Sequence, residues 1–158
     1  MVLTADSADP PSGSKERPVA NVPRLMMELD QHVARFGPDH PEAIAVAHRL
    51  AVGFWCAGEL DRAIGILNEA LQRIRLWTDP NDPLQFDLLG TLAEILAEQG
   101  RWERAAGIHR NIVGLSITRH GEAHPSTLAA KGDLALVLFE LGHDEEAARL
   151  EDQVYSRA

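Results

Sequence analysis

The chain has 158 residues, enough for one globular domain, and its formal net charge of −9 argues against nucleic acid or an anionic membrane as the main partner, since both require a basic surface. Only 5% of the residues are aromatic, while Ala and Leu are abundant, a composition that favours helix over sheet. The single cysteine, Cys56, excludes an internal disulfide, and without a secretory signal or an apolar run of ~20 residues we expect a cytoplasmic protein.

Residues 1–20 are rich in Asp, Ser, Pro and Gly, have little to bury, and are predicted to form a disordered tail. Helically spaced apolar residues over 21–36 predict a first helix, with Asn21 as its N-cap and Pro23 in its first turn. Gly37 supplies the left-handed residue that ends it. We expect residues 21–158 to form one helical domain.

After this helix the chain repeats itself every 42 residues. Self-similarity at such a period predicts a stacked repeat protein, in which each unit buries its apolar face on its neighbours. The predicted repeats cover about residues 37–78, 79–120 and 121–158. The columns with one residue type in all three copies are Pro41, Pro83 and Pro125; Leu50, Leu92 and Leu134; Ala51, Ala93 and Ala135; Gly58, Gly100 and Gly142; and Ala63, Ala105 and Ala147.

Each repeat is predicted to be a helix that opens at the proline, a tight turn at the glycine, and a second helix. The small residue early in the second helix, such as Ala63, lets it approach the Leu-Ala face of the first closely. Stepping back 42 residues from the second helix of repeat one reaches the helix at 21–36, which we interpret as a half-repeat. The expected fold is therefore an all-α solenoid of seven helices. Its last helix, with Glu151 in the column of Leu67, is predicted to close a complete small array with a polar face.

The Leu-Ala pair, the turn glycine and the early Ala resemble tetratricopeptide repeats. The 42-residue period and the segments Gly37-Pro38-Asp39-His40-Pro41 and Gly121-Glu122-Ala123-His124-Pro125 resemble the kinesin light chain type of this family. The resemblance implies a concave groove, lined by the first helices, that binds another protein. Kinesin-type members often carry Asn just before Leu-Ala to bind a peptide backbone, whereas this chain has Arg49, Thr91 and Asp133 there.

The same helical register predicts which residues face the groove. The surface they form is expected to be basic at repeat one and acidic over repeats two and three. Two aromatic residues, Trp55 and Phe139, belong either to the core or to the groove as exposed anchors. The predicted groove residues are His48, Arg49, Val52, Trp55, Thr91, Glu94, Glu98, Asp133, Leu136, Phe139 and Glu140.

No residue pattern indicates chemistry, so we predict no enzyme, metal or cofactor. His120 and His124 are four apart, but Gly121 lies between them, and we do not expect them to share a helix face. His48 and Cys56 lie about 12 Å apart along one helix, too far for a base and its nucleophile. Glu94 and Glu98 could act as a carboxylate pair, although a solvated helix face explains them better.

The leading hypothesis is a non-catalytic adaptor that holds a peptide or helix of another protein, with basic residues, in its groove. One alternative is self-association, because the helix at 21–36 has a face without a partner helix. The other is a small-molecule receptor or enzyme that uses the groove as a pocket.

Overall fold

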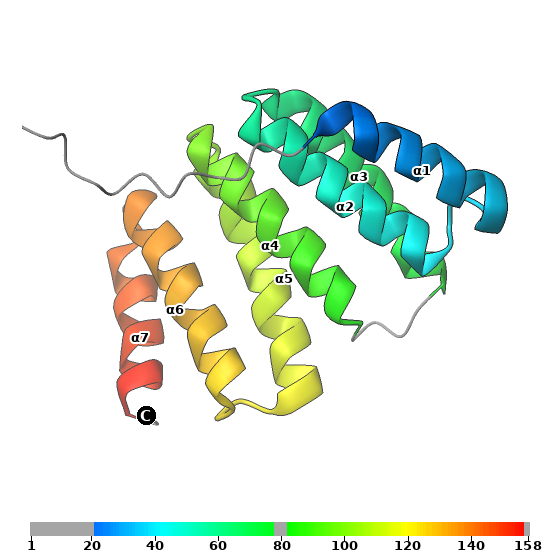
Figure 1. Cartoon of the computed structure of the whole chain (residues 1–158). Coiled ribbons are helices and arrows are strands. Elements are labelled where there is room, and N and C mark those ends of the chain that lie inside the picture. The colour runs from blue at the N-terminus through cyan, green and yellow to red at the C-terminus, as the bar shows by residue number, and fades with distance from the viewer. Residues whose placement is uncertain (1–20, 78–81, 157–158) are drawn as a thin grey trace, which may run out of the picture.

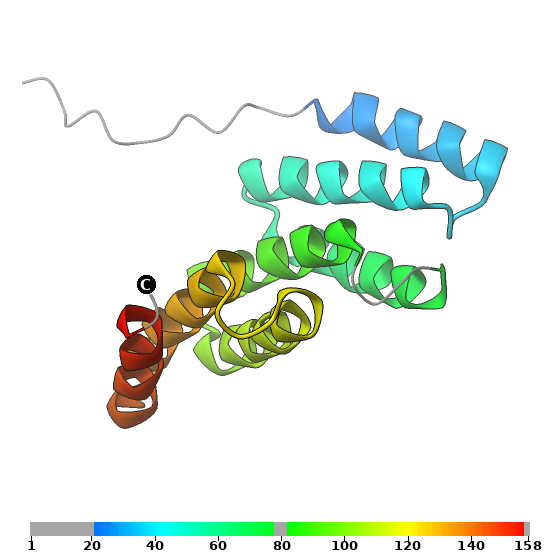
Figure 2. The ribbon, with the colours of Figure 1, turned by 90° about the horizontal axis from the view of Figure 1, so that it is seen from below.

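The computed structural model describes residues 21–77 and 82–156, which form seven helices and no strand (Figure 1). The predicted tail at 1–20 lies outside the described residues. The all-α repeat fold is confirmed: α2–α3, α4–α5 and α6–α7 are helix pairs that follow one another, with α1 packed against α2 at one end (Figures 1 and 2). The helices are α1 (Val22–Phe36), α2 (Pro41–Cys56), α3 (Leu60–Trp77), α4 (Pro83–Glu98), α5 (Trp102–His120), α6 (Pro125–Glu140) and α7 (Asp144–Tyr155).

The first helix of every pair begins at its proline, and the residue before the proline caps it. Asp82 does so in the usual way, since its Oδ1 accepts a hydrogen bond from the Leu84 amide at 2.8 Å. In the other two pairs a histidine takes the place of the acid: Nδ1 of His40 and of His124 accepts from the amide two residues on, at 3.2 Å in each case. A histidine nitrogen can accept only when it carries no proton, so both caps require a neutral ring.

Each capping histidine also stacks on the residue that ends the preceding helix. The ring centroids of Phe36 and His40 are 4.7 Å apart, and those of His120 and His124 are 4.4 Å apart. His120 ends α5 and His124 caps α6, so they do not share a helix face, as expected, yet the loop brings their rings together. These stacks fix the direction in which one repeat enters the next.

The turn inside each pair depends on a glycine with a left-handed backbone. Gly58, Gly100 and Gly142 have φ values of 81°, 71° and 76°. The next amide then donates back into the first helix, as from Arg101 to the Leu96 carbonyl at 2.8 Å. A side chain at these positions would strain the backbone, which explains why glycine recurs.

The core runs through the stack without interruption. Ala63, Ala105 and Ala147 are completely buried, which lets the two helices of each pair approach closely. Leu96 of α4 is likewise fully buried between the pairs. Burial of a leucine side chain contributes about 1.5–3 kcal/mol, so buried residues such as Leu96 contribute much of the stability.

The α7 end of the stack is polar, as the sequence predicts. Among the described residues of α7 only Ala147 is buried. Lys131 of α6 occupies the column of the buried Leu89, and its own side chain is buried against α7. Its Nζ donates to Oε1 of Gln153 at 2.9 Å, so the ammonium group has a polar partner at this end of the molecule.

Candidate functional site: the groove face of α2, α4 and α6

The predicted groove residues lie on α2, α4 and α6, which run side by side in the same direction (Figure 1). None of the eleven residues is buried. We call the exposed side of these three helices the groove face. It is built by the first helix of every pair. Because each of these helices begins at its proline, equivalent residues lie at the same distance from the helix start in all three.

The junction between α2 and α4 is closed by two side-chain hydrogen bonds. His48 Nε2 lies 2.8 Å from Thr91 Oγ1, and Trp55 Nε1 donates to Glu98 Oε2 at 2.6 Å. Both bonds join residues 43 positions apart, which places each partner one column further along the next repeat. Trp55 is therefore a half-buried residue that closes the junction, and not a fully buried core residue.

The junction between α4 and α6 lacks these contacts. The same 43-residue step pairs Gly90 with Asp133 and Ala97 with Glu140, so at these two columns α4 has no side chain that could bond to α6. A Cβ built on Gly90 would meet no atom within 4 Å, which shows that the space beside it is open. The second junction is therefore hollow where the first is filled.

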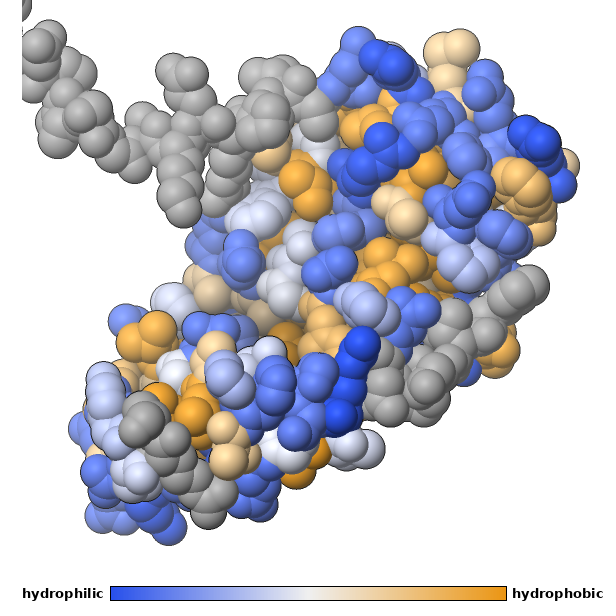
Figure 3. Space-filling model, turned by 60° about the horizontal axis from the view of Figure 1, so that its bottom comes forward, coloured by the Kyte–Doolittle hydropathy of each residue, from blue (hydrophilic) through white to orange (hydrophobic). Residues whose placement is uncertain are grey.

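A cavity of about 530 Å³ lies at this junction, between α4 and α6 with α5 behind it. Figure 3 shows the molecule from the side where α4 and α6 begin; most of its surface is hydrophilic, and apolar residues appear in the recesses between helices. We call this cavity the α4–α6 pocket. It is lined by Pro83, Phe86, Asp87, Ile112, Ser116, Arg119, His120, Ser126, Ala129, Ala130 and Asp133.

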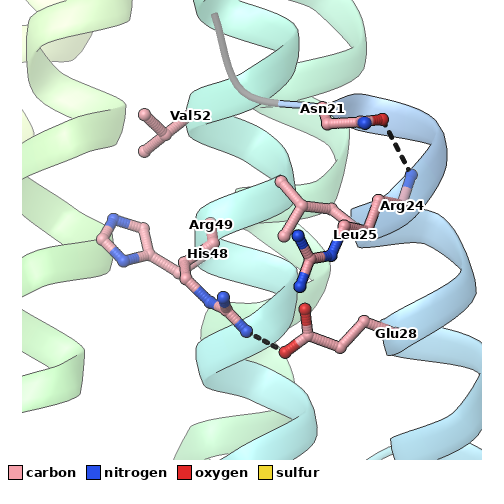
Figure 4. Close-up of a pocket in the computed structure, with 7 residues that line it drawn as sticks. All are labelled: Asn21, Arg24, Leu25, Glu28, His48, Arg49 and Val52. Carbon is pink, nitrogen blue, oxygen red and sulfur yellow. Dashed lines mark hydrogen bonds and ion pairs between the residues drawn. The ribbon is translucent and has the colours of Figure 1, made fainter. Parts of the chain in front are cut away.

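The face of α2 that looks towards α1 carries a paired charge. Arg49 reaches towards α1 and forms an ion pair with Glu28, whereas His48 points to the opposite side, towards α4 (Figure 4). The basic charge that the sequence predicts at repeat one is thus offset by a carboxylate of α1. A second cavity of about 460 Å³ lies here, with Leu25 and Val52 in its lining.

Two half-buried histidines interact electrostatically with carboxylates of α4 and α6. Burial lowers the pKa of His48, and Asp87 opposes the shift. Burial likewise lowers the pKa of His109 on α5, and Asp133 opposes that shift. Each carboxylate is thus close enough to interact with an imidazole behind it, while its own side chain remains exposed.

The far end of α6 presents apolar side chains to solvent. Leu136 is 64% exposed and Phe139 is 40% exposed, with Glu140 beside them. Phe139 stands in the column of Trp55, but no indole-like hydrogen bond holds it. Of the two predicted aromatic residues, it is the one that offers an open apolar surface.

Sequence reasoning missed Asp87, Phe86 and Glu28. A signal for Asp87 was present, since it precedes Thr91 by one helical turn on the same face, and its column holds Ala45 in repeat one. Glu28 could not be found in this way. Its ion pair with Arg49 joins α1 to α2, and the repeat pattern does not state which residue of a neighbouring helix Arg49 contacts.

The carboxylates and histidines of the described residues form no grouped set. Glu98, one of the two carboxylates considered as a pair, is engaged by the Trp55 indole. Within residues 21–77 and 82–156, no three His, Cys, Asp or Glu side chains are grouped as ligands for a metal ion. None of the helices described is both long and apolar enough to cross a membrane.

Comparison with known proteins gives one family and several similar folds. Residues 84–158 match the tetratricopeptide repeat family. No curated protein matches the chain. The nearly identical TPR-like repeats of a candidate kinesin light chain from Podosopora anserina superpose with a TM-score of 0.74 at 22% identity, over 86% of this chain and 64% of that one. BtubC (BKLC) from P. vanneervenii gives a TM-score of 0.66 at 20% identity, over 92% of this chain and 57% of that one. The chain thus spans less than two thirds of either structure.

Proposed function

We propose that this chain, whose residues 84–158 match the tetratricopeptide repeat family and whose fold is that of kinesin light chain-like repeats, is a non-catalytic, cytoplasmic adaptor that binds a segment of another protein along its groove face. Tetratricopeptide repeats generally mediate protein–protein interaction, and families of this type are typically non-catalytic. The observation that carries the proposal is the groove face itself: three adjacent helices whose eleven predicted groove residues are all at least partly exposed, with four carboxylates against one guanidinium.

The charge of this face favours a basic partner. Glu94, Asp133 and Glu140 are exposed, whereas the one guanidinium among the predicted groove residues, that of Arg49, is paired with Glu28. Complementary charge accelerates association and selects partners more than it adds raw affinity. Binding should therefore weaken as salt is raised. Leu136 and Phe139 add an apolar surface at one end of the face.

The test begins with affinity capture of the partner from native cells and continues with fluorescence anisotropy of the captured segment. Glu94→Lys combined with Glu140→Lys should weaken binding roughly tenfold or more. Glu103→Lys combined with Glu145→Lys makes the same change of charge on exposed positions of α5 and α7 and serves as the control. If both double variants bind like the unmodified protein, the groove face is not the binding surface.

A second candidate function is self-association through α1. Leu25, Glu28 and His32 stand in the columns of Leu67, Ala70 and Ile74, which are fully or almost fully buried in repeat one. The three α1 residues remain partly exposed, because no first helix precedes α1 among the described residues. A second copy could cover this face. Sedimentation velocity over a wide range of concentrations decides the matter, and a monomer at every concentration rejects this candidate.

A further inference from the structure

We propose that the α4–α6 pocket is the anchor site of the groove face, and that it takes an arginine or lysine side chain of the bound segment with the cationic group between Asp87 and Asp133. The inference rests on the proposed function and adds to it which side chain is recognised and where. It follows from three observations: the pocket is open, its lining is apolar below, and its two walls carry carboxylates.

The pocket lies beside a column whose residue differs between the two junctions. At the first junction His48 fills the space and contacts Thr91. Gly90 replaces the imidazole at the second junction, and a Cβ built on it would meet no atom within 4 Å. The residue that faces it, Asp133, is correspondingly exposed.

The lining suits the stem of a long basic side chain. Phe86, Ile112 and Ala130 come from three different helices and line the same cavity. Arginine and lysine bury their methylene groups along apolar surfaces while the charged end stays near water and carboxylates. A cavity of about 530 Å³ accommodates such a stem together with part of the neighbouring backbone.

The charge of the lining sets the sign of the ligand. Asp87 on α4 and Asp133 on α6 belong to opposite walls. Arg119 lies at the end of α5, with its guanidinium 5.9 Å from the centre of the Phe86 ring. Desolvation and the neighbouring His124 and Arg119 lower the pKa of His120, which favours its neutral form. Two carboxylates therefore face one guanidinium, and the pocket favours a cation.

The site can be tested with small probes, without knowledge of the partner. Amide spectra of ¹⁵N-labelled full-length protein are recorded during titration with the blocked tripeptide acetyl-Ala-Arg-Ala-amide. The same tripeptide with citrulline, which has almost the shape of arginine but no charge, is the matched probe. The arginine peptide should shift amides around Asp87 and Asp133 and bind roughly tenfold more tightly than its citrulline twin.

Protein variants then locate the binding. Asp87→Asn with Asp133→Asn should reduce arginine binding to the citrulline level, whereas Glu103→Gln with Glu145→Gln, on α5 and α7, should leave it unchanged. Gly90→His restores the side chain found at the first junction, one helical turn from the pocket residue Phe86, and should weaken arginine binding.

Gly132→His is the matched control for this filling. It makes the identical change one repeat further on, where the 42-residue register turns the position away from α4 and an added Cβ also meets no atom within 4 Å. It should leave arginine binding unchanged, and circular dichroism confirms that each variant is folded.

Three results would overturn the proposal: equal affinity for the arginine and citrulline peptides, arginine binding that survives the two Asp→Asn changes, or tighter binding of acetyl-Ala-Glu-Ala-amide in the same pocket. The proposed function fails separately. If Glu94→Lys with Glu140→Lys abolishes partner binding but the arginine probe does not bind, the groove face is retained as the binding surface and the arginine site is rejected. If the probe binds but neither double charge reversal affects partner binding, the arginine site is retained and the proposed function of the groove face is rejected.

Discussion

The junction between α2 and α4 and the junction between α4 and α6 are built from the same repeat, but their surfaces differ. At the first, His48 and Trp55 reach Thr91 and Glu98 and close the space between the helices. At the second, the corresponding residues of α4 are a glycine and an alanine, and a pocket remains. The comparison teaches that one set of columns makes the fold, while a different set decides whether a junction is filled or open.

The largest effect should come from the core that both junctions share. Leu96 is completely buried, and Leu96→Ala should destabilise the protein by about 2–5 kcal/mol, through lost burial and the cavity left behind. Leu136→Ala, on the exposed side of α6, removes the same atoms and should cost less than about 0.5 kcal/mol. Urea unfolding of both variants measures the difference, and similar losses would contradict the assigned burial.

The next effect separates two kinds of glycine. Gly100→Ala should destabilise by roughly 1–2 kcal/mol, because the turn needs its φ of 71°. Gly90→Ala should stabilise by roughly 0.4–1 kcal/mol, since Gly90 is helical and an added methyl meets no neighbour. The two melting temperatures should move in opposite directions. A loss of stability in Gly90→Ala would show that the second junction is not open.

A smaller effect tests the closed junction. Thr91→Val keeps the shape of the side chain but removes the hydroxyl that contacts His48, and should cost about 1 kcal/mol. Asp133→Asn, in the same column at the open junction, should change the free energy of unfolding by less than about 0.5 kcal/mol. A double-mutant cycle that combines Thr91→Val with His48→Leu should reveal coupling; additive losses would mean that the contact contributes nothing.

The smallest effect concerns pH. Burial lowers the pKa of His48, near the closed junction, and of His109, near the open one, from the ordinary value of 6.5, with Asp87 and Asp133 opposing. Each ring binds a proton less readily in the folded chain than in the unfolded chain. Stability is therefore complete above about pH 6.5 and declines as the pH falls below it.

The melting temperature should accordingly be lower at about pH 5.5 than at about pH 7.5. His48→Gln with His109→Gln should show a smaller drop than the unmodified protein. The single variants reveal which junction contributes more, and an undiminished drop in the double variant would assign the acid sensitivity to other groups.

Much of the fold could be predicted, because it depends on columns that recur. The prolines, turn glycines and small alanines placed every described helix start and turn without knowledge of any contact. The half-repeat followed from the same 42-residue step. In the structure α1 packs on α2 as the second helix α3 packs on α4, the first helix of the next pair. The histidines of the proline motif were recognised as repeat residues, but their role as caps needed the observed direction of Nδ1.

The candidate site was predicted only in part. The position of a residue within the repeat predicts the helix face on which it lies, and none of the eleven groove residues is buried. It does not say which neighbour a long side chain will choose. Arg49 turns to Glu28 on α1, and Trp55 reaches Glu98 one repeat away, so both depend on distances between helices that a sequence does not state. The pocket was missed because it lies between residues of α4, α5 and α6, and its size depends on distances between these helices.

The polar end of the stack has a consequence for assembly. A repeat stack could grow without limit if the α7 end of one molecule accepted the α1 end of the next, since such a head-to-tail contact does not close on itself. Glu151 in a leucine column and the exposed Arg149 and Asp152 of α7 make that contact costly, because a second molecule would have to remove water from charged groups. The chain thus carries its own protection against forming fibres, at the end opposite the uncovered face of α1.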